Sequence, residues 1–118
     1  MTQQYVLVIS DCKPGREAEY NEYYDNRHIP DILEHQPEVV CAQRFSVASH
    51  FAPEGLPSWR FSTLYTVETD DMDAYLQRST DLMKAGKIPP SDAAEPSTAA
   101  VFRLIPLGPA IIRTREEQ

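Results

Sequence analysis

The order of strand-like and helix-like segments constrains the fold of this chain more than any other feature. Four segments are rich in β-branched and aromatic residues or alternate in bulk, as strands do, and two have the apolar spacing of amphipathic helices. In chain order the segments are strand, helix, strand, strand, helix and strand, over residues 5–11, 16–34, 39–48, 59–67, 70–86 and 100–107. Short connections and right-handed crossovers then predict an α+β fold of the ferredoxin-like βαββαβ type, with a four-stranded antiparallel sheet and both helices on one face.

The length of the chain is that of one domain. A chain of 118 residues can bury one core but not two, so residues 1–118 are predicted to form a single domain with residues 108–118 as a C-terminal arm. Two helices can cover only one side of the sheet, and the predicted strands are apolar or small on both sides. The uncovered side is best covered by a second copy of the chain, which predicts a homodimer through the sheet face.

The balance of charge argues against nucleic acid and anionic membranes as partners. With 18 acidic and 11 basic residues, the net charge of −7 repels phosphate groups. No apolar run approaches the roughly 20 residues that span a membrane, and the first residues lack a signal-peptide pattern. We therefore expect no contact with nucleic acid or membrane, and a cytoplasmic location.

Motifs for metals, nucleotides and redox chemistry are missing from the sequence. Cys12 and Cys41 lack CxxC spacing, so both are expected to be reduced, with Cys41 as a small core residue. The histidines His28, His35 and His50 do not match metal-ligand spacings, and the four glycines form no phosphate-binding loop. The sequence predicts neither a metal nor a nucleotide cofactor.

A proline interrupts the first helical pattern directly after a histidine. Tyr20, Tyr24 and His28 recur at four-residue steps, and Pro30, which lacks an N–H group, follows. The helix is therefore predicted to end or bend at residues 27–29 and to resume as a short second turn through residue 34.

The predicted helix end makes His28 a candidate for proton transfer. At a helix C-terminus the dipole favours the protonated imidazole, and the nearby Asp25 and Asp31 favour it too. His28 would then titrate close to neutral pH and exchange a proton with a ligand. The alternative is a structural histidine that caps the last carbonyl groups before Pro30 and binds no ligand.

The two central strands have unequal sides. In residues 59–67 bulky side chains alternate with smaller or polar ones, and residues 39–48 alternate likewise. Periodicity does not decide which side meets the helices. If Arg44 or Arg60 points into a closed space, its guanidinium needs an anionic partner, which could be a ligand or a carboxylate of the chain itself.

Several segments could border a pocket. Tyr20, Tyr23 and Tyr24 either line one, where their hydroxyls could orient a carbonyl or a phenol, or simply form core. Residues 50–58 are predicted to form a long hairpin loop. Residues 87–99 are predicted to form a loop that is a candidate flap.

One stretch of the chain resembles a known family. The run YNEYYD at 20–25 is followed by two spacer residues, HIPDIL at 28–33, Pro37 and AQRF at 42–45. This pattern resembles the EthD-like family of the dimeric α+β barrel superfamily. Glu38 stands where that family usually has glycine, and Tyr23 where tryptophan is common. The resemblance implies ferredoxin-like subunits that dimerise through their sheets, with a ligand cavity between sheet and helices.

The resemblance also implies a reaction type. Many members of the superfamily use a histidine and a tyrosine as proton carriers without a cofactor. We therefore expect a cofactor-independent enzyme that acts on a small oxygenated aromatic or polyketide-like compound, as a cyclase, isomerase, dehydratase or decarboxylase. In this scheme His28 is the general acid or base and Asp25 holds its imidazole, while Tyr24 or Tyr65 polarises the substrate oxygen.

Other residues complete the expected site. Arg44 would receive a carboxylate, and Tyr65, Tyr20 and Trp59 would be further substrate contacts. One alternative is a non-catalytic binding or accessory protein that holds a degradation intermediate in the same pocket. Another is haem binding with His28 as the axial ligand.

Overall fold

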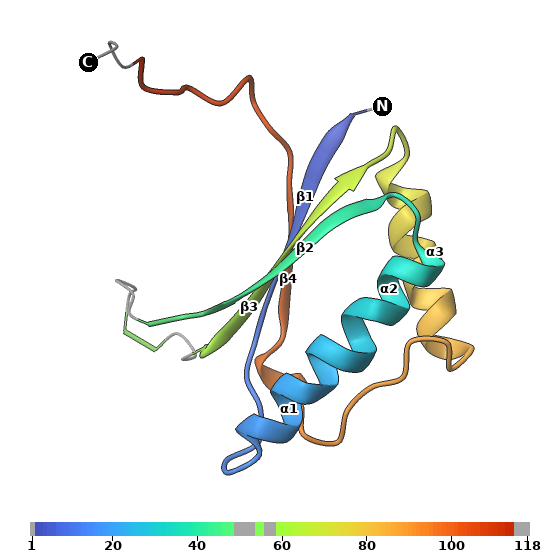
Figure 1. The fold of residues 1–118 in the computed structure, drawn as a ribbon, viewed down its shortest axis with the longest axis vertical. Helices are drawn as coiled ribbons and strands as arrows, with labels where there is room; N and C mark the ends of the chain where they lie inside the picture. The colour runs from blue at the N-terminus through green and yellow to red at the C-terminus, as the bar shows by residue number, and fades with distance from the viewer. Residues whose placement is uncertain (1, 49–53, 56–58, 115–118) are drawn as a thin grey trace.

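The computed structural model describes residues 2–48, 54–55 and 59–114. Its elements are β1 (Gln3–Ser10), α1 (Glu17–Tyr23), η1 (Tyr24–His28), α2 (Ile29–His35), β2 (Val39–Ser46), β3 (Phe61–Glu68), α3 (Met72–Lys84), η2 (Pro96–Thr98) and β4 (Ala100–Leu104). The four strands form one sheet in the order β2-β3-β1-β4, and all neighbours are antiparallel. The helices α1, α2 and α3 lie on the same side of this sheet (Figure 1). The predicted ferredoxin-like α+β fold is confirmed.

The strand register decides which side of the sheet meets the helices. Tyr65 of β3 lies opposite Val6 of β1 and Ala42 of β2, and Val6 and Tyr65 are buried against α2 and α3. The bulky side of β3 therefore faces the helices. The neighbouring strand is irregular, because a bulge between Val39 and Cys41 breaks the alternation of β2. Cys41 is exposed as a result, so its predicted place in the core is wrong.

The main core joins the sheet to the helices α2 and α3. Its buried side chains come from β1, β2, β3, α2, α3 and the loop after α3: Val6, Val39, Tyr65, Val67, Ile32, Met72, Tyr75 and Ile88. Ala93 of the same loop is also buried, and its carbonyl accepts a hydrogen bond of 2.8 Å from the Lys13 N–H. The loop that was a candidate flap is thus packed into the fold at two points.

Local signals place the second helix where the sequence predicts it. The Asp71 carboxylate caps α3 by accepting a hydrogen bond of 3.0 Å from the Ala74 N–H. Gly86 follows the helix with a φ of +74°, a conformation that glycine adopts without strain. The predicted hairpin loop at 50–58 lies outside the described residues except for positions 54 and 55.

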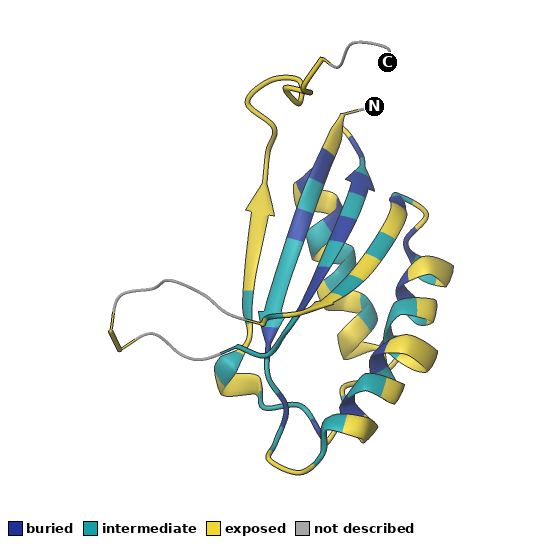
Figure 2. Ribbon diagram, turned by 60° about the vertical axis from the view of Figure 1, so that its left-hand side comes forward, coloured by how far each residue is buried: buried dark blue, intermediate teal, exposed yellow. Residues whose placement is uncertain are grey.

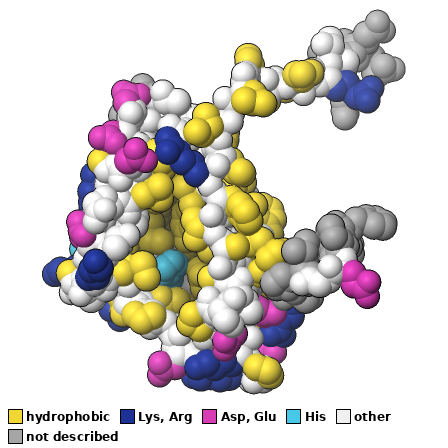
Figure 3. Space-filling view, turned by 180° about the vertical axis from the view of Figure 1, so that it is seen from behind, with side chains coloured by type: hydrophobic (Ala, Val, Ile, Leu, Met, Phe, Trp, Pro, Cys, Tyr) yellow, Lys and Arg dark blue, Asp and Glu magenta, His cyan; other side chains and the backbone are white. Residues whose placement is uncertain are grey.

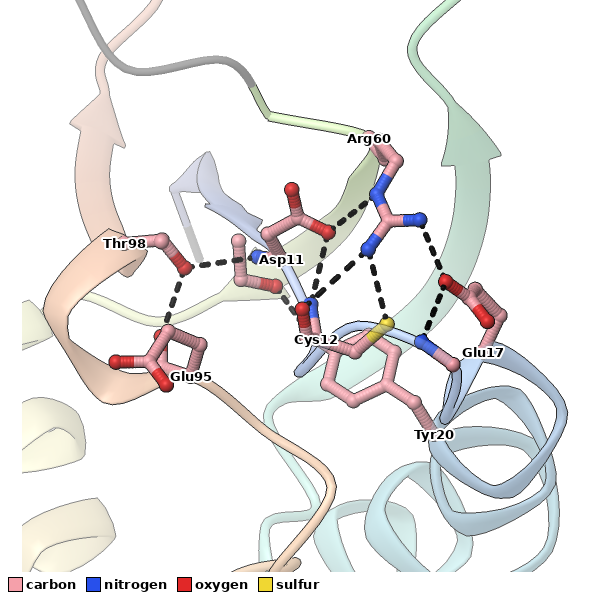
Figure 4. Close-up of polar contacts among 9 residues, drawn as sticks. Asp11, Cys12, Glu17, Tyr20, Arg60, Glu95 and Thr98 are labelled. Atoms are coloured by element: carbon pink, nitrogen blue, oxygen red, sulfur yellow. Dashed lines mark hydrogen bonds and ion pairs between the residues drawn. The ribbon is translucent and has the colours of Figure 1, made fainter.

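Arg60 ties the end of β1 to the start of α1 (Figure 4). Its guanidinium donates to Asp11 at 2.6 Å and to Glu17 at 2.8 Å, and a third bond of 3.3 Å reaches the Cys12 carbonyl. The anionic partners of Arg60 are therefore carboxylates of the chain itself, which was one of the two predicted alternatives. Burial raises the pKa of the Cys12 thiol beside it.

The side of the sheet opposite the helices has no covering layer among the described residues. We call it the open face; among its apolar side chains are Leu7, Leu64, Phe45, Phe102 and Leu104. The chain leaves β4 at Leu104, three residues earlier than predicted, and continues as an extended arm with fully exposed Leu107 and Ile111. Figure 2 shows β4 and this arm as largely exposed. Within residues 2–48, 54–55 and 59–114, no helix combines the length and apolar character needed to cross a bilayer.

Candidate functional site

A cavity of about 260 Å³ lies between the sheet and the helices. Its apolar wall is built by Val6, Val8, Ile32, Leu76, Met83, Ile88 and Val101. The polar groups at its wall are Tyr24, His28, Tyr65, Tyr75 and Ser79. Figure 3 shows the hollow, with a histidine surrounded by apolar side chains. The cavity therefore combines a mostly apolar wall with a few groups capable of hydrogen bonding, as small-molecule sites do.

A widened helical turn brings His28 to this cavity. Residues 24–28 form a π-helical turn in which the Ile29 N–H bonds to the Tyr24 carbonyl five residues before it. Pro30 then occupies the first turn of α2, where its missing N–H is tolerated. The helical chain continues from this turn directly into α2, so the prediction of a helix terminus at His28 is wrong. The dipole argument for a protonated imidazole fails with it, since the dipole does not end there.

The imidazole of His28 is neutral at pH 7. Burial lowers its pKa to about 4, with Arg44 acting in the same direction and Asp31 opposing it. The predicted titration near neutral pH is therefore wrong, because sequence spacing does not reveal how deeply the ring is buried. Above pH 4 the ring offers one N–H and one free nitrogen lone pair.

Tyr23 decides which nitrogen carries the proton. Its hydroxyl donates to the Pro89 carbonyl, which can only accept. A tyrosine has one hydroxyl proton, so in its second contact, 3.1 Å from Nδ1 of His28, the Tyr23 oxygen accepts. Nδ1 is then the protonated nitrogen, and the lone pair left for a ligand is on Nε2.

Asp25 was predicted to hold the imidazole of His28, but it lies beside Arg44 instead. Its side chain is 61% exposed, and its carboxylate lies 3.6 Å from the Arg44 guanidinium. Tyr23 occupies the role that was predicted for Asp25. The widened turn explains the difference, because it changes the direction in which residues 24–28 point relative to a regular helix.

Replacing Tyr23 by Phe should change the tautomer of His28. Without the acceptor oxygen, Nδ1 loses the partner that keeps it protonated, and the ring shifts toward the Nε2–H form. The ¹⁵N chemical shifts of His28 measure this directly, and the Tyr5→Phe variant on the open face is the control. Unchanged His28 shifts in Tyr23→Phe would show that another group fixes the ring.

Tyr65 presents a hydroxyl without a partner. The residue is 4% exposed and lines the cavity, and its hydroxyl makes no hydrogen bond within the described residues. Burial raises the pKa of Tyr65, so the hydroxyl keeps its proton at neutral pH. A buried donor without an acceptor is unfavourable, and an oxygen atom of a bound ligand would satisfy it.

Three residues predicted to bind substrate lie in packing contacts away from the cavity wall. Tyr20 is buried and bonds to the hydroxyl of Ser10. The Trp59 indole N–H donates to the Thr98 carbonyl at 2.7 Å. Arg44 lies 4.7 Å from the centre of the Tyr24 ring and donates to Asn21 at 2.9 Å. Of the predicted binding residues, Tyr65 alone lines the cavity; of the predicted catalytic ones, His28 and Tyr24 do.

Two polar groups of the cavity, Tyr75 and Ser79, were not predicted from the sequence. They lie one turn apart on α3 and line the same cavity as Tyr65 and His28. The Tyr75 ring also belongs to the buried core. The four-residue step to Ser79 is the one signal that could have marked the pair. In the described part of the chain, no three His, Cys, Asp or Glu side chains gather to hold a metal ion.

Comparisons with known proteins return few matches. No family model matches this chain, and no curated protein does. A solved structure resembles it. That structure is a crystal structure of an ethyl tert-butyl ether d (EthD) family protein from Bacillus halodurans, with 15% sequence identity and a TM-score of 0.48, over 94% of this chain and 100% of the other. None of these comparisons assigns a ligand or a reaction to the cavity.

Proposed function

We propose that this protein is a cofactor-independent enzyme that moves a proton next to a carbonyl group of a small oxygenated, aromatic or polyketide-like compound. The observation that supports this most is the pairing of a free Nε2 lone pair on His28 with the unpartnered hydroxyl of Tyr65 in one apolar cavity. A cavity of about 150 Å³ can hold benzene, so about 260 Å³ suits one substituted ring.

The chemistry follows from the roles of these two groups. Nε2 of His28 would take a proton from the carbon beside the carbonyl, and the electron pair left behind would move to the carbonyl oxygen. The Tyr65 hydroxyl would donate a hydrogen bond to that oxygen as it becomes negative. The new imidazolium and the enolate stabilise each other, which offsets the burial that keeps the free imidazole neutral. Return of the proton to another carbon of the enolate system completes an isomerisation. In a cyclisation the enolate carbon instead attacks a second carbonyl carbon of the substrate, whose oxygen takes the proton from the imidazolium. In a dehydration the enolate expels a hydroxyl group from the neighbouring carbon, and this group takes the proton and leaves as water.

Deuterium exchange tests this proposal without knowledge of the natural substrate. Small aromatic ketones would be incubated with the protein in D₂O, and loss of the proton signals beside the carbonyl would be followed by NMR. We expect the protein to speed exchange for the ketones that bind, and the His28→Asn variant not to do so. Saturable binding without any enhanced exchange would contradict an enzymatic role.

That contradicting outcome corresponds to a second candidate function. The pKa of about 4 makes the free His28 ring a weak base, which favours a protein that binds a degradation intermediate and leaves it unchanged. Haem binding through His28 stays a prediction, and a Soret band after haem addition is its measurement.

We further propose that a second copy of the chain covers the open face. Phe102 of β4 lies opposite Leu7 of β1, which in turn lies opposite Leu64 of β3. This row crosses three adjacent strands without a covering layer in the described chain. The arm begins at the edge of the same sheet and carries fully exposed Leu107 and Ile111. Apolar surfaces of this extent are usually buried against a partner, and the self-pairing of one face gives a twofold dimer.

Placing a charge on the open face should therefore separate the subunits. Phe102 is 45% exposed in the single chain, and Phe102→Glu would bury a carboxylate in the proposed interface. Sedimentation analysis should show a dimer for the wild type and a monomer for this variant. Leu33→Glu is the matched control, because Leu33 is 46% exposed but lies on α2, away from the open face. A monomeric wild type at micromolar concentration would refute the assembly.

A further inference from the structure

We propose that the cavity binds uncharged carbonyl compounds and rejects carboxylates of the same shape. This inference rests on the site of the proposed function and names the class of substrate that the site takes. It also narrows the reaction, since decarboxylation requires a carboxylate substrate.

The wall of the cavity offers no charge to pair with an anion. Among the described residues, those that line it are apolar or are neutral hydrogen-bonding groups: the tyrosines, Ser79 and the imidazole of His28. A carboxylate that enters such a space loses its hydration and gains no counter-ion. An uncharged ligand does not meet this cost.

The charged groups closest to His28 lie outside the cavity wall. Nη1 of Arg44 donates to Asn21 at 2.9 Å and lies 3.6 Å from Asp25, and the guanidinium lies against the rings of Tyr24 and Phe61. The buried Nε of Arg44 makes no hydrogen bond within the described residues. The Asp31 carboxylate accepts a hydrogen bond of 2.8 Å from Arg27. Because Arg44 is not part of the cavity wall and lies beside the Asp25 carboxylate, we propose that it does not receive a substrate carboxylate there.

Two of the polar groups define what an uncharged ligand must carry. The buried Tyr65 hydroxyl is a donor without a partner, so it needs an acceptor such as a carbonyl oxygen. Nε2 of His28 has a lone pair, because Tyr23 and Pro89 keep the proton on Nδ1. Nε2 needs a hydroxyl or an acidic C–H. One substituted ring that bears a carbonyl group beside such a hydrogen satisfies both groups within about 260 Å³.

Matched pairs of small aromatic compounds test the charge preference. Each pair would consist of a methyl ketone and the carboxylate with the same ring, for example 2-hydroxyacetophenone and 2-hydroxybenzoate. The pairs of the panel would differ in their ring substituents. Binding to the wild-type chain at pH 7 would be measured by calorimetry and by the ¹⁵N shifts of His28. We expect the tightest ligand to be a ketone that binds roughly 100-fold or more tightly than its carboxylate.

Two variants assign the preference to its residues. Tyr65→Phe should weaken ketone binding about tenfold, the usual loss for one hydrogen bond. Arg44→Lys, which keeps the charge but loses the fork of donors, should leave the ratio between ketone and carboxylate unchanged. A fall in carboxylate binding in Arg44→Lys would instead show that Arg44 reaches the ligand and would overturn the proposal.

The remaining outcomes separate this inference from the proposed function. If a carboxylate is the tightest ligand of the panel, or if no ketone shifts the His28 signals at millimolar concentration, the inference is wrong. Enzymatic exchange of protons on a bound carboxylate would still leave the proposed function standing. Selective binding of ketones without proton exchange would support this inference and contradict the proposed function.

Discussion

Replacing His28 by Asn should lower the rate of proton exchange by about 100-fold or more, with the fold retained. An amide can accept a hydrogen bond but cannot take a proton, so the variant loses the base and keeps much of the shape. The ring faces a cavity on one side, so the replacement reduces packing only on the other side, where the rings of Tyr23 and Tyr24 lie. The rate is read from the deuterium exchange of bound ketones, and folding from circular dichroism.

The control for this variant is His35→Asn at the end of α2, which does not line the cavity. The rate of the wild type should also depend on pH in a defined direction. The neutral imidazole is the active form, so the rate should stay level from pH 7 down to about pH 5 and fall as the pH drops through the His28 pKa of about 4. Full activity in His28→Asn, or complete unfolding of this variant, would contradict the assignment of His28 as the catalytic base.

Replacing Tyr20 by Ala should lower the free energy of unfolding by about 3–5 kcal/mol, the usual cost of removing a buried aromatic ring. Tyr20 is 1% exposed, and its ring centre lies 4.9 Å from that of Tyr24 and 5.3 Å from that of Phe61. The Arg44 guanidinium stacks 5.8 Å from the same ring. Truncation would leave a hollow beside the rings of Tyr24 and Phe61 and would expose one side of the Arg44 guanidinium to it.

Urea denaturation of the purified chains measures this loss. Tyr20→Phe is the control, because it removes only the hydroxyl that bonds to Ser10 and should cost about 0.5–1.5 kcal/mol. If Tyr20→Ala were as stable as Tyr20→Phe, the ring would not be an essential part of the core. If instead Tyr20→Ala were stable and lost ligand binding, the original prediction of Tyr20 as a substrate contact would be restored.

The fold could be predicted from the sequence because its signals are local. Strand-like segments, the Asp71 cap and the stop at Gly86 are each determined by a few neighbouring residues. The order of the segments and the rules of chain connection then leave few topologies. The bulge in β2 was missed, because an extra residue in a strand depends on pairing with β3.

The site could be predicted only in part, for a physical reason. Tyr20, Tyr24 and His28 share a four-residue spacing, yet Tyr20 is packed beside Ser10 and Arg44 while His28 meets the cavity. Spacing gives the side of a helix but not where along that side the neighbouring sheet leaves a space. The pKa of His28 was predicted wrongly for the same reason, since burial dominates it and burial depends on the whole fold.

The hydrogen bond from Tyr23 to the Pro89 carbonyl makes the chemistry of one residue depend on the position of a distant segment. Should Pro89 withdraw, the Tyr23 proton would be free to turn toward Nδ1 of His28, and the imidazole would have to carry its own proton on Nε2. Nε2 would change from a hydrogen-bond acceptor to a hydrogen-bond donor, with no change in the overall charge of the protein. The connection after α3 therefore sets not only the shape of the hollow but also the polarity of its reactive nitrogen.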